Sequence, residues 1–499
     1  MTDTVYVATR EFITANTDIL ADQPFIGTLK AGIRYERSII GSEGFGGLTL
    51  SWGEVSLYNL ERDHDSLLTT QTVDGEEIVI KVTQLGQSYD SAITIAQLVG
   101  AGAYANDEQE VVIRVRDPSY RLRVAAQPVL FQGTGDLEGG IDLQGKRKPL
   151  LFGRAHNISP ALLIASELVF MVSYRAIQEI EAVYDSGSAL TGPTADYATS
   201  ALLRAASLAG GTYATCLAEG LFRVGSPFAQ ITCDAKGDNV GGYVNTTGTI
   251  VRRLLSIATD LTDPGDLLVH SFEDLETLQP AVVGYYLDPE SSLNVDDVIA
   301  HLMGGIGGWG GFDVIGEAKF GVNILVAPSG TSTANYDEVD VLSISRERLP
   351  DSIDPPPWRR RVAYERNWTQ IANPVAGVVQ DDPDRAAWLN KPYKVAATPD
   401  SDGASILANY PSAQDPPVTE AYFDLKADAL AEAIRRLLLE SQGYTLTRVE
   451  LKVQPFLHNI GECLTLTYPI WNLTDGLKMR IVALSDDGDQ NQIGATLFG

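Results

Sequence analysis

Turn-forming residues occur along the whole length of this chain and limit it to folds built from short segments joined by turns. It contains 46 glycines and 24 prolines among 499 residues, which demands many turns between short segments. Runs rich in β-branched residues lie between these turns, such as residues 78–82 and 111–115, and such runs are typical of strands. The chain is also longer than one ordinary domain of about 100–200 residues. These features predict a multidomain protein that is mostly β.

Two stretches in the middle of the chain change from strand-like to helical periodicity. Asn245 or Thr246 is suited to cap a helix whose apolar residues recur about every 3.6 positions. A second helix is expected to begin at Asn294, with two aspartates in its first turn near the positive end of the dipole. It is expected to end at the glycine pair Gly304-Gly305. Both helices predict an α/β domain inserted into a β protein.

The clearest helical pattern spans residues 424–442. Its apolar residues recur on one face, and Gly443 is suited to end the helix. The expected buried stripe consists of Leu430, Ile434, Leu437 and Leu438. The polar, proline-rich residues 372–420 before it predict an extended arm that reaches a neighbouring subunit or, equally, a loop on the surface.

These patterns predict an α+β protein, predominantly β, and divide it into four parts. The expected parts are an N-terminal β domain (1–150), a β-rich domain (151–241), an acidic α/β domain (242–335) and a β domain (336–499) that holds the proline-rich excursion (372–420) and the helix (424–442).

The chain carries a formal net charge of −28, from 65 acidic and 37 basic residues. An acidic surface repels phosphates, which disfavours a role in binding DNA or RNA. No Lys or Arg occurs between Arg253 and Lys319, so this interval is expected to set a strong local negative potential. Its acids are Asp260, Asp263, Asp266, Glu273, Asp274, Glu276, Asp288, Glu290, Asp296, Asp297, Asp313 and Glu317. They form either a solvated face or a wall that does not bind DNA passing beside it.

The sequence contains no motif that indicates catalysis or metal binding. It lacks HExxH, GxSxG, a P-loop and an EF-hand loop, and its five histidines are far apart and read as structural or surface residues. A GxGxxG match at residues 305–310 follows a predicted helix instead of preceding it, so a packed turn around Trp309 is expected instead of a dinucleotide site. The three cysteines, Cys216, Cys233 and Cys463, form no CxxC pair and read as buried thiols. We therefore expect no enzyme activity, no cofactor and no metal.

No targeting or membrane segment is evident. The N-terminal residues lack a basic region followed by an apolar one, so no signal peptide is expected. The most apolar stretch, residues 162–172, is interrupted by Glu167 and is too short to span a bilayer. Synthesis in a cytoplasm without membrane insertion is expected.

Six short segments resemble, in their order along the chain, stretches of tail-tip and baseplate hub proteins of long-tailed, siphovirus-like bacteriophages. The first, GKRKPLLFGRAHNISP (145–160), is similar to a junction of the form GK-x-x-P-hydrophobic-x-G-x-x-x-N-x-x-P that follows an N-terminal β domain. The C-terminal part is similar to their last module, with a DAxAEAxRxL helix, a GExLxLxYP segment and a final MRI strand. The other segments are residues 238–255, 357–368, 428–437, 461–469 and 479–481.

The resemblance implies β-barrel-like hub modules, including a C-terminal barrel, and a ring that links the tail tube to the distal tip or fibre. It implies a homotrimer, or alternatively a hexamer, within the virion tail tip, with the tube, the distal tail protein and a central fibre as partners and DNA as passing cargo. In that setting Asp260, Asp263, Asp266, Glu273, Asp274 and Glu276 would form a DNA-repelling surface. One branch of such hubs carries an iron–sulfur cluster on clustered cysteines, which the scattered cysteines here do not match. Two other interpretations stay open: a distal tail ring or receptor-contacting protein, and a tail-associated cell-wall or polysaccharide hydrolase.

Overall fold

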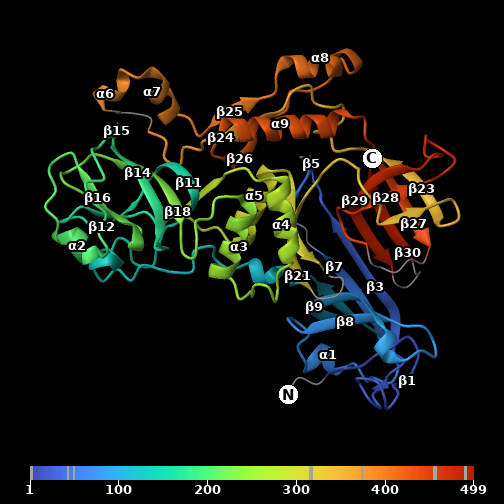
Figure 1. Cartoon of the computed structure of the whole chain (residues 1–499). Helices are drawn as coiled ribbons and strands as arrows, with labels where there is room; N and C mark the ends of the chain where they lie inside the picture. Colours follow the sequence, from blue (N-terminus) through green and yellow to red (C-terminus); the bar gives the residue numbers. More distant parts are fainter. Residues whose placement is uncertain are drawn as a thin grey trace.

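The computed structural model describes residues 4–41, 44–48, 51–313, 318–371, 376–452, 458–487 and 492–499. Strands account for 37% of the chain and helices for 20%, which confirms an α+β protein that is predominantly β. In Figure 1 the strands of residues 150–240 gather at one end of the molecule and helices α3 to α5 lie in the middle. The N-terminal and C-terminal strands lie together at the other end.

The first and last parts of the chain share the largest sheet. β3 (Leu29–Ser38) pairs antiparallel with β29 (Leu477–Asp487), so strands far apart in sequence are neighbours. Along its main path the strand order is β23 (Val341–Glu347), β27 (Leu446–Lys452), β30 (Gln492–Phe498), β29, β3, β7 (Trp52–Tyr58), β10 (Glu110–Arg116), β9 (Ile93–Asp107) and β8 (Glu77–Val82). Off this path, β28 (Cys463–Leu466) pairs with β29 and with β22 (Ala334–Tyr336). Among the described residues the main path ends at β23 and β8. The β-barrel-like modules and the C-terminal barrel stay predictions.

A second sheet is organised around β11 (Leu150–Ile158), which continues the junction motif. Nearly every residue of β11 is buried, as expected for a central strand covered on both faces. The strand order of this sheet is β15 (Ser188–Ala189), β14 (Ile177–Asp185), β18 (Ile231–Asp238), β11 and β19 (Gly284–Leu287). A smaller sheet shares its core, in the order β12 (Ala161–Ile164), β13 (Val169–Met171), β17 (Leu221–Val224) and β16 (Tyr213–Cys216).

Both predicted helix starts in the middle of the chain are confirmed. Thr246 caps α3 (Thr247–Ala258) in a capping box with Thr249, and Asn294 does the same for α5 (Val295–Gly305) with Asp297. The reciprocal bonds satisfy backbone N–H groups that lack a partner within the helix. α4 (Val269–Leu278) lies between them in sequence. Their apolar faces share one core with β11, β19, β20 (Gly308–Asp313) and β21 (Lys319–Ile324).

The predicted C-terminal helix is present as α9 (Lys426–Ser441), but its buried face differs from the expected one. Leu437 is 3% exposed, as predicted, whereas Leu438 is 56% exposed. Leu438 points about 140° away from Ala433 around the helix axis, so it lies outside the buried face. The buried face instead contains Ala429 and Ala433, whose small side chains allow close packing.

Residues 372–420 were expected to form an extended arm or a surface loop, but the part that the structure describes is folded and not extended. A reach to a neighbouring subunit stays a prediction. Residues 376–420 contain α6 (Gly377–Gln380), α7 (Pro383–Leu389), β25 (Lys394–Ala397) and α8 (Asp400–Asn409). Asp382 caps α7, and Pro383 occupies its first turn, where no N–H is needed. β25 pairs with β24 (Arg361–Tyr364), which also pairs with β26 (Thr419–Phe423). The prolines therefore start and connect folded elements; residues 372–375 lie outside the described residues.

Several shorter elements complete the description. They are β1 (Phe12–Ile13), β2 (Pro24–Phe25), β4 (Ile40–Gly41), β5 (Gly44–Phe45), β6 (Gly47–Leu48), α1 (Ser66–Thr69) and α2 (Ser200–Ala205). Trp309, expected to be packed within the glycine run, is 6% exposed and lies on β20.

Candidate functional site

Two of the segments that carry the family resemblance, residues 145–160 and 357–368, meet in one polar joint. Asn157, at the end of β11, donates from its side-chain amide to Asn367 Oδ1 at 2.8 Å and to the carbonyl of Thr369 at 2.5 Å. The Asn367 amide in turn donates to three carbonyl oxygens at 2.9–3.2 Å, those of Trp388, Leu389 and Lys391. These bonds tie the strand of the junction motif to the end of α7 and the loop that follows it.

A local irregularity of β11 aims Asn157 at this joint. The register between β11 and β18 shifts between Ala155 and Ile158, and Asn157 has a φ of +53°. A bulge of this kind re-aims a side chain, and asparagine tolerates the left-handed conformation better than most residues. Asn157 is fully buried, so its side chain depends on these partners for its hydrogen bonds.

His156 lies next to Asn157 and is held between two carboxylates. Its Nε2 lies 2.7 Å from Oδ1 of Asp424, and its Nδ1 lies 3.9 Å from Oδ2 of Asp234. Asp234 also accepts hydrogen bonds from the backbone N–H of Asn157 at 2.7 Å and from the hydroxyl of Tyr184 at 2.8 Å. Asp424 lies just before α9, so this cluster connects β11 and β18 to the start of the C-terminal helix.

The charges in this cluster are set by their neighbours. Burial alone would lower the pKa of His156, but the carboxylates of Asp234 and Asp424 outweigh it and raise the pKa to about 9. Burial would raise the pKa of Asp424, and its bonds to His156 and Arg154 lower it. His156 is therefore a cation at neutral pH, and it is 7% exposed. The ion pairs of His156 with Asp234 and Asp424 join β11 to β18 and to the start of α9.

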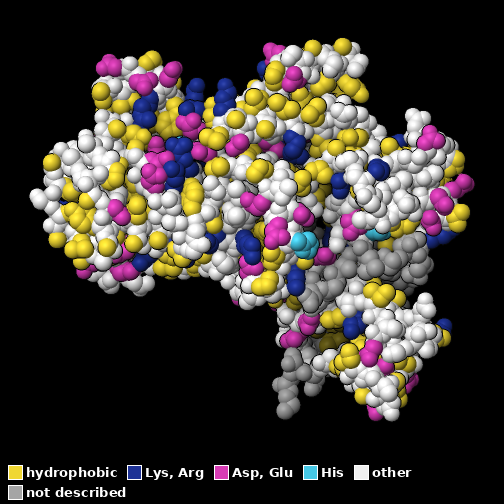
Figure 2. Space-filling model, in the orientation of Figure 1, with side chains coloured by type: hydrophobic (Ala, Val, Ile, Leu, Met, Phe, Trp, Pro, Cys, Tyr) yellow, Lys and Arg dark blue, Asp and Glu magenta, His cyan; other side chains and the backbone are white. Residues whose placement is uncertain are grey.

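Further ion pairs extend the joint along β11 and β18. Nε of Arg154 lies 2.6 Å from Oε2 of Glu181. Asp238, fully buried at the end of β18, pairs with both Arg175 and Arg253. Figure 2 shows acidic and basic side chains gathered together over β11 and β14, beneath α6 and α7.

A second buried charge cluster joins α9 to α5. Glu432 is 1% exposed and binds Arg435 Nε at 2.8 Å and Arg436 Nε at 2.6 Å. Arg436 donates to the carbonyls of Gly304 and Gly305, and Arg435 to that of Ile306. The two arginines thereby supply partners for carbonyl groups at the end of α5 that no helical N–H reaches.

The acidic interval is less negative than its sequence suggests. Nε of Arg121 lies 3.1 Å from Oδ1 of Asp260, and Nη1 of the same side chain lies 2.9 Å from Oδ1 of Asp266. Arg252 pairs with Asp263. Both arginines come from outside the interval, so counting residues within it overestimates the local negative potential.

The other predicted surface acids lie on α4. Glu276 accepts a hydrogen bond from Thr246 Oγ1 at 2.7 Å, at the start of α3. Glu273 and Asp274 are exposed and form no ion pair with any described residue. Figure 2 shows acidic side chains among basic ones over α3 and α4. Glu317, the last acid of the interval, lies outside the described residues.

The described parts of the chain contain no cluster of three or more His, Cys, Asp and Glu residues that could hold a metal ion. Cys216, Cys233 and Cys463 are all buried and unpaired, as expected. Burial raises the pKa of the Cys216 thiol to about 11. No helix within the described ranges is long and apolar enough to cross a membrane.

Comparison with known proteins gives likeness only among solved structures. No family model matches the chain, and no curated protein matches it. A tail protein from Neisseria meningitidis MC58 is 8% identical, with a TM-score of 0.39 over 95% of each chain. The 43 kDa tail protein of prophage MuSo2 from Shewanella oneidensis is 10% identical, with a TM-score of 0.36 over 96% of this chain and 95% of that one.

A third solved structure belongs to the virion of a native gene transfer agent particle. Its chain is 14% identical, with a TM-score of 0.40 over 71% of this chain and 84% of that one. TM-scores at these levels do not establish a shared fold.

Proposed function

We propose that this protein is a structural component of a bacteriophage tail. The observation that carries the proposal is the joint at Asn157 and Asn367. These residues belong to two segments that resemble phage tail proteins and that lie 210 positions apart. The contact between Asn157 and Asn367 joins these two segments. His156, in the first of them, also binds Asp424 just before α9. The resembling segments therefore connect separate parts of the fold.

Within the tail, the proposed role is a baseplate hub ring that links the tail tube to the distal tip or fibre. Edge strands with unpaired backbone groups favour assembly with another chain. β8 and β23 end the main path of the largest sheet, and β8 exposes Val79 and Val82, at 46% and 48%. A ring of copies would cover such edges, and a homotrimer is the assembly we propose, with a hexamer as the alternative.

The proposed channel role rests on α4. Glu273 and Asp274 are exposed acids without an ion-pair partner among described residues, and unpaired carboxylates repel the phosphates of DNA. In the assembled ring we place them, with Asp260, Asp263, Asp266 and Glu276, on a surface beside the passing genome. The paired acids contribute less, because Arg121 and Arg252 offset their charge.

Mass and symmetry test the hub proposal. Light scattering and negative-stain class averages of the purified protein should give a trimeric ring with a central pore. A ring of six copies, with six copies per particle by quantitative mass spectrometry, would favour a distal tail ring instead. A monomer that stays a monomer when mixed with tail-tube protein would contradict both. Zymography on host cell wall tests the hydrolase alternative, since a zone of lysis would overturn a purely structural role.

A further inference from the structure

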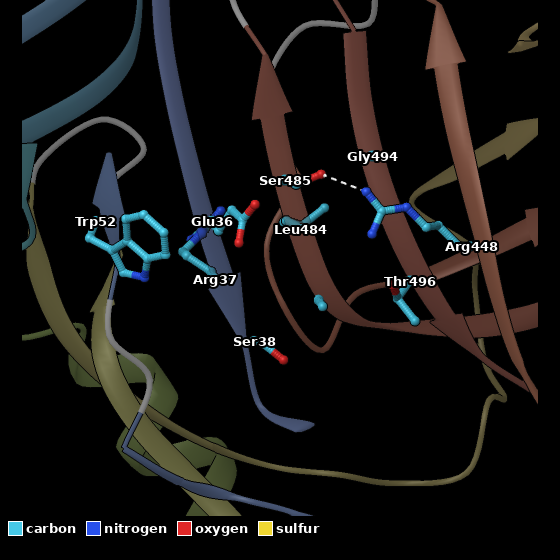
Figure 3. A pocket seen from close by; sticks show the side chains of 10 residues that line it. Glu36, Arg37, Ser38, Trp52, Arg448, Leu484, Ser485, Gly494 and Thr496 are labelled. Atoms are coloured by element: carbon cyan, nitrogen blue, oxygen red, sulfur yellow. Dashed lines mark hydrogen bonds between the residues drawn. The ribbon is translucent and has the colours of Figure 1, made fainter. Parts of the chain in front are cut away.

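A cleft of about 310 Å³ lies on one face of the largest sheet and has no role in the proposed assembly. Its volume is at the lower end of the range of about 300–1,000 Å³ for ligand pockets. Figure 3 shows Trp52 and Glu36 on one side, Arg448 on the other, and Ser38 and Thr496 along it. The cleft lies across five neighbouring strands, β7, β3, β29, β30 and β27.

The strand register explains why these side chains share a face. Trp52 lies opposite Glu36, Glu36 opposite Ser485, and Ser485 opposite Gly494. Residues directly opposite each other on antiparallel strands point to the same side of a sheet. The next row of directly opposed residues on the same face consists of Ser38, Ala483, Thr496 and Arg448.

The cleft is hollow because its middle carries small side chains. Gly494 has no side chain, and a Cβ at this position would collide with Oγ of Ser485 and lie 3.6 Å from Nη2 of Arg448. In the next row of opposed residues, the small side chain of Ala483 lies in the middle of the cleft. The opposite face of these strands packs into an apolar core through Tyr35, Leu484 and Ala495, so the hollow opens to solvent only.

The side chains at the two sides of the cleft form few close contacts with other described residues. Trp52 is 62% exposed, although strand alternation would favour a polar residue on a solvent face. Glu36 is exposed and forms no ion pair with a described residue. Arg448 is 3.5 Å from Oγ of Ser485 and 3.9 Å from Oε1 of Glu347, both of them long contacts. An indole face, a carboxylate, a guanidinium and a hydroxyl thus remain available to a ligand.

These groups select a neutral, polyhydroxylated ring. The Trp52 face offers an apolar surface to the C–H groups of a sugar ring, while Glu36 accepts and Arg448 donates hydrogen bonds to hydroxyl groups. Glu36 repels a phosphate or a carboxylate, and a net charge of −28 adds to that repulsion. β3 and β29 are paired on both sides, so no free strand edge is offered to an extended peptide.

We propose that this cleft binds a saccharide, with Trp52 stacking on the ring and Glu36, Ser485 and Arg448 binding its hydroxyl groups. Trp52 on β7 and Arg448 on β27 lie four strand spacings apart, roughly 19 Å. The cleft volume of about 310 Å³ accommodates one or two sugar units and not a long chain.

Saturation-transfer difference NMR on the full chain tests this proposal. The probes are glucose, galactose, mannose, rhamnose and N-acetylglucosamine, with the open-chain polyol sorbitol as a ligand that lacks a ring face. At least one sugar should receive saturation at its ring C–H protons while sorbitol receives none. No transfer to any of the five sugars, or equal transfer to sorbitol, would overturn the proposal.

Three variants locate the binding. Trp52→Ala should weaken binding about tenfold or more, the factor that corresponds to about 1.4 kcal/mol. Gly494→Val should fill the hollow and abolish binding, and valine suits a strand. Trp471→Ala removes another exposed tryptophan, 43% exposed and outside the cleft, and should change nothing. Equal losses in Trp52→Ala and Trp471→Ala would contradict the site.

The same samples separate sugar binding from assembly. Light scattering of Trp52→Ala should give the same mass as the unaltered chain. If no sugar binds and the mass falls, the cleft is an interface between copies, and the saccharide proposal is wrong.

Discussion

The side-chain amide of Asn157 donates to Oδ1 of Asn367 at 2.8 Å, across 210 positions of sequence. Each asparagine is buried, and the side-chain amide of each also donates to backbone carbonyls, that of Thr369 for Asn157 and those of Trp388, Leu389 and Lys391 for Asn367. A buried polar pair of this kind fixes geometry, because any other arrangement leaves its groups without hydrogen bonds. It is this pair that sets how the β11 sheet meets the segment around α7.

Asn367→Asp should destabilise the protein by about 2–4 kcal/mol. The substitution keeps the shape of the side chain but removes the donor that three backbone carbonyls share. Urea denaturation followed by circular dichroism measures the loss. Asn472→Asp is the matched control, since Asn472 is exposed and its substitution should cost less than about 0.5 kcal/mol. Equal losses at the two positions would argue against a joint at Asn367.

Stability should fall as the pH rises from 6.5 towards 9, because of His156. Its pKa is about 9 in the folded protein and 6.5 without its partners, so the folded state holds the proton over this range and the unfolded state does not. The contribution is complete below pH 6.5 and is lost as the pH rises through 9, on the order of 3 kcal/mol in all.

Denaturation at a series of pH values measures this loss, and His156→Gln should flatten the profile while lowering stability throughout. The exposed His270 provides a control, since His270→Gln should leave the profile unchanged. A profile of unaltered slope in His156→Gln would assign the pH dependence to other groups.

Leu437→Asp should abolish soluble assembly, and Leu438→Asp should be tolerated. Leu437 is 3% exposed and Leu438 56%, so only the first substitution buries an unpaired charge, at a cost of several kcal/mol. Size-exclusion chromatography of the two variants checks the difference. Similar yields of assembled protein would mean that α9 does not pack as described.

Reversing Glu273 and Asp274 to lysine in assembled particles should slow genome release. These two acids lie free of ion pairs within the described structure, so the substitution changes charge without breaking a contact. Reversing Asp260, Asp263 and Asp266 should also slow release, but it would break the pairs with Arg121 and Arg252 as well. DNA release measured by dye fluorescence gives the rate, and unchanged kinetics in the Glu273 and Asp274 variant would contradict a DNA-repelling surface.

The features predicted correctly from sequence are those set by near neighbours. Thr246 and Asn294 start helices through bonds to residues three positions later, and that pattern is visible in the chain. Leu438 was misplaced because the buried face of α9 is centred on Ala429 and Ala433, whose small side chains the pattern of leucines and isoleucine did not single out. The joint was not predicted, since Asn157, His156 and their partners are separated by 77 to 268 positions and no local pattern links them. Of these residues, only His156, Asn157 and Asn367 lie within the resembling segments.

The pairing of β3 with β29 also constrains the order in which the molecule is made. During synthesis β3 and β7 leave the ribosome early, while β29 and β30 are among the last elements to emerge. β3 must therefore wait with one edge open, and its side chains face water until most of the chain has been translated. Contacts between distant segments form slowly, so the sheet is completed late. A message cut short before β29 would therefore yield a product with an open strand edge that is prone to aggregation.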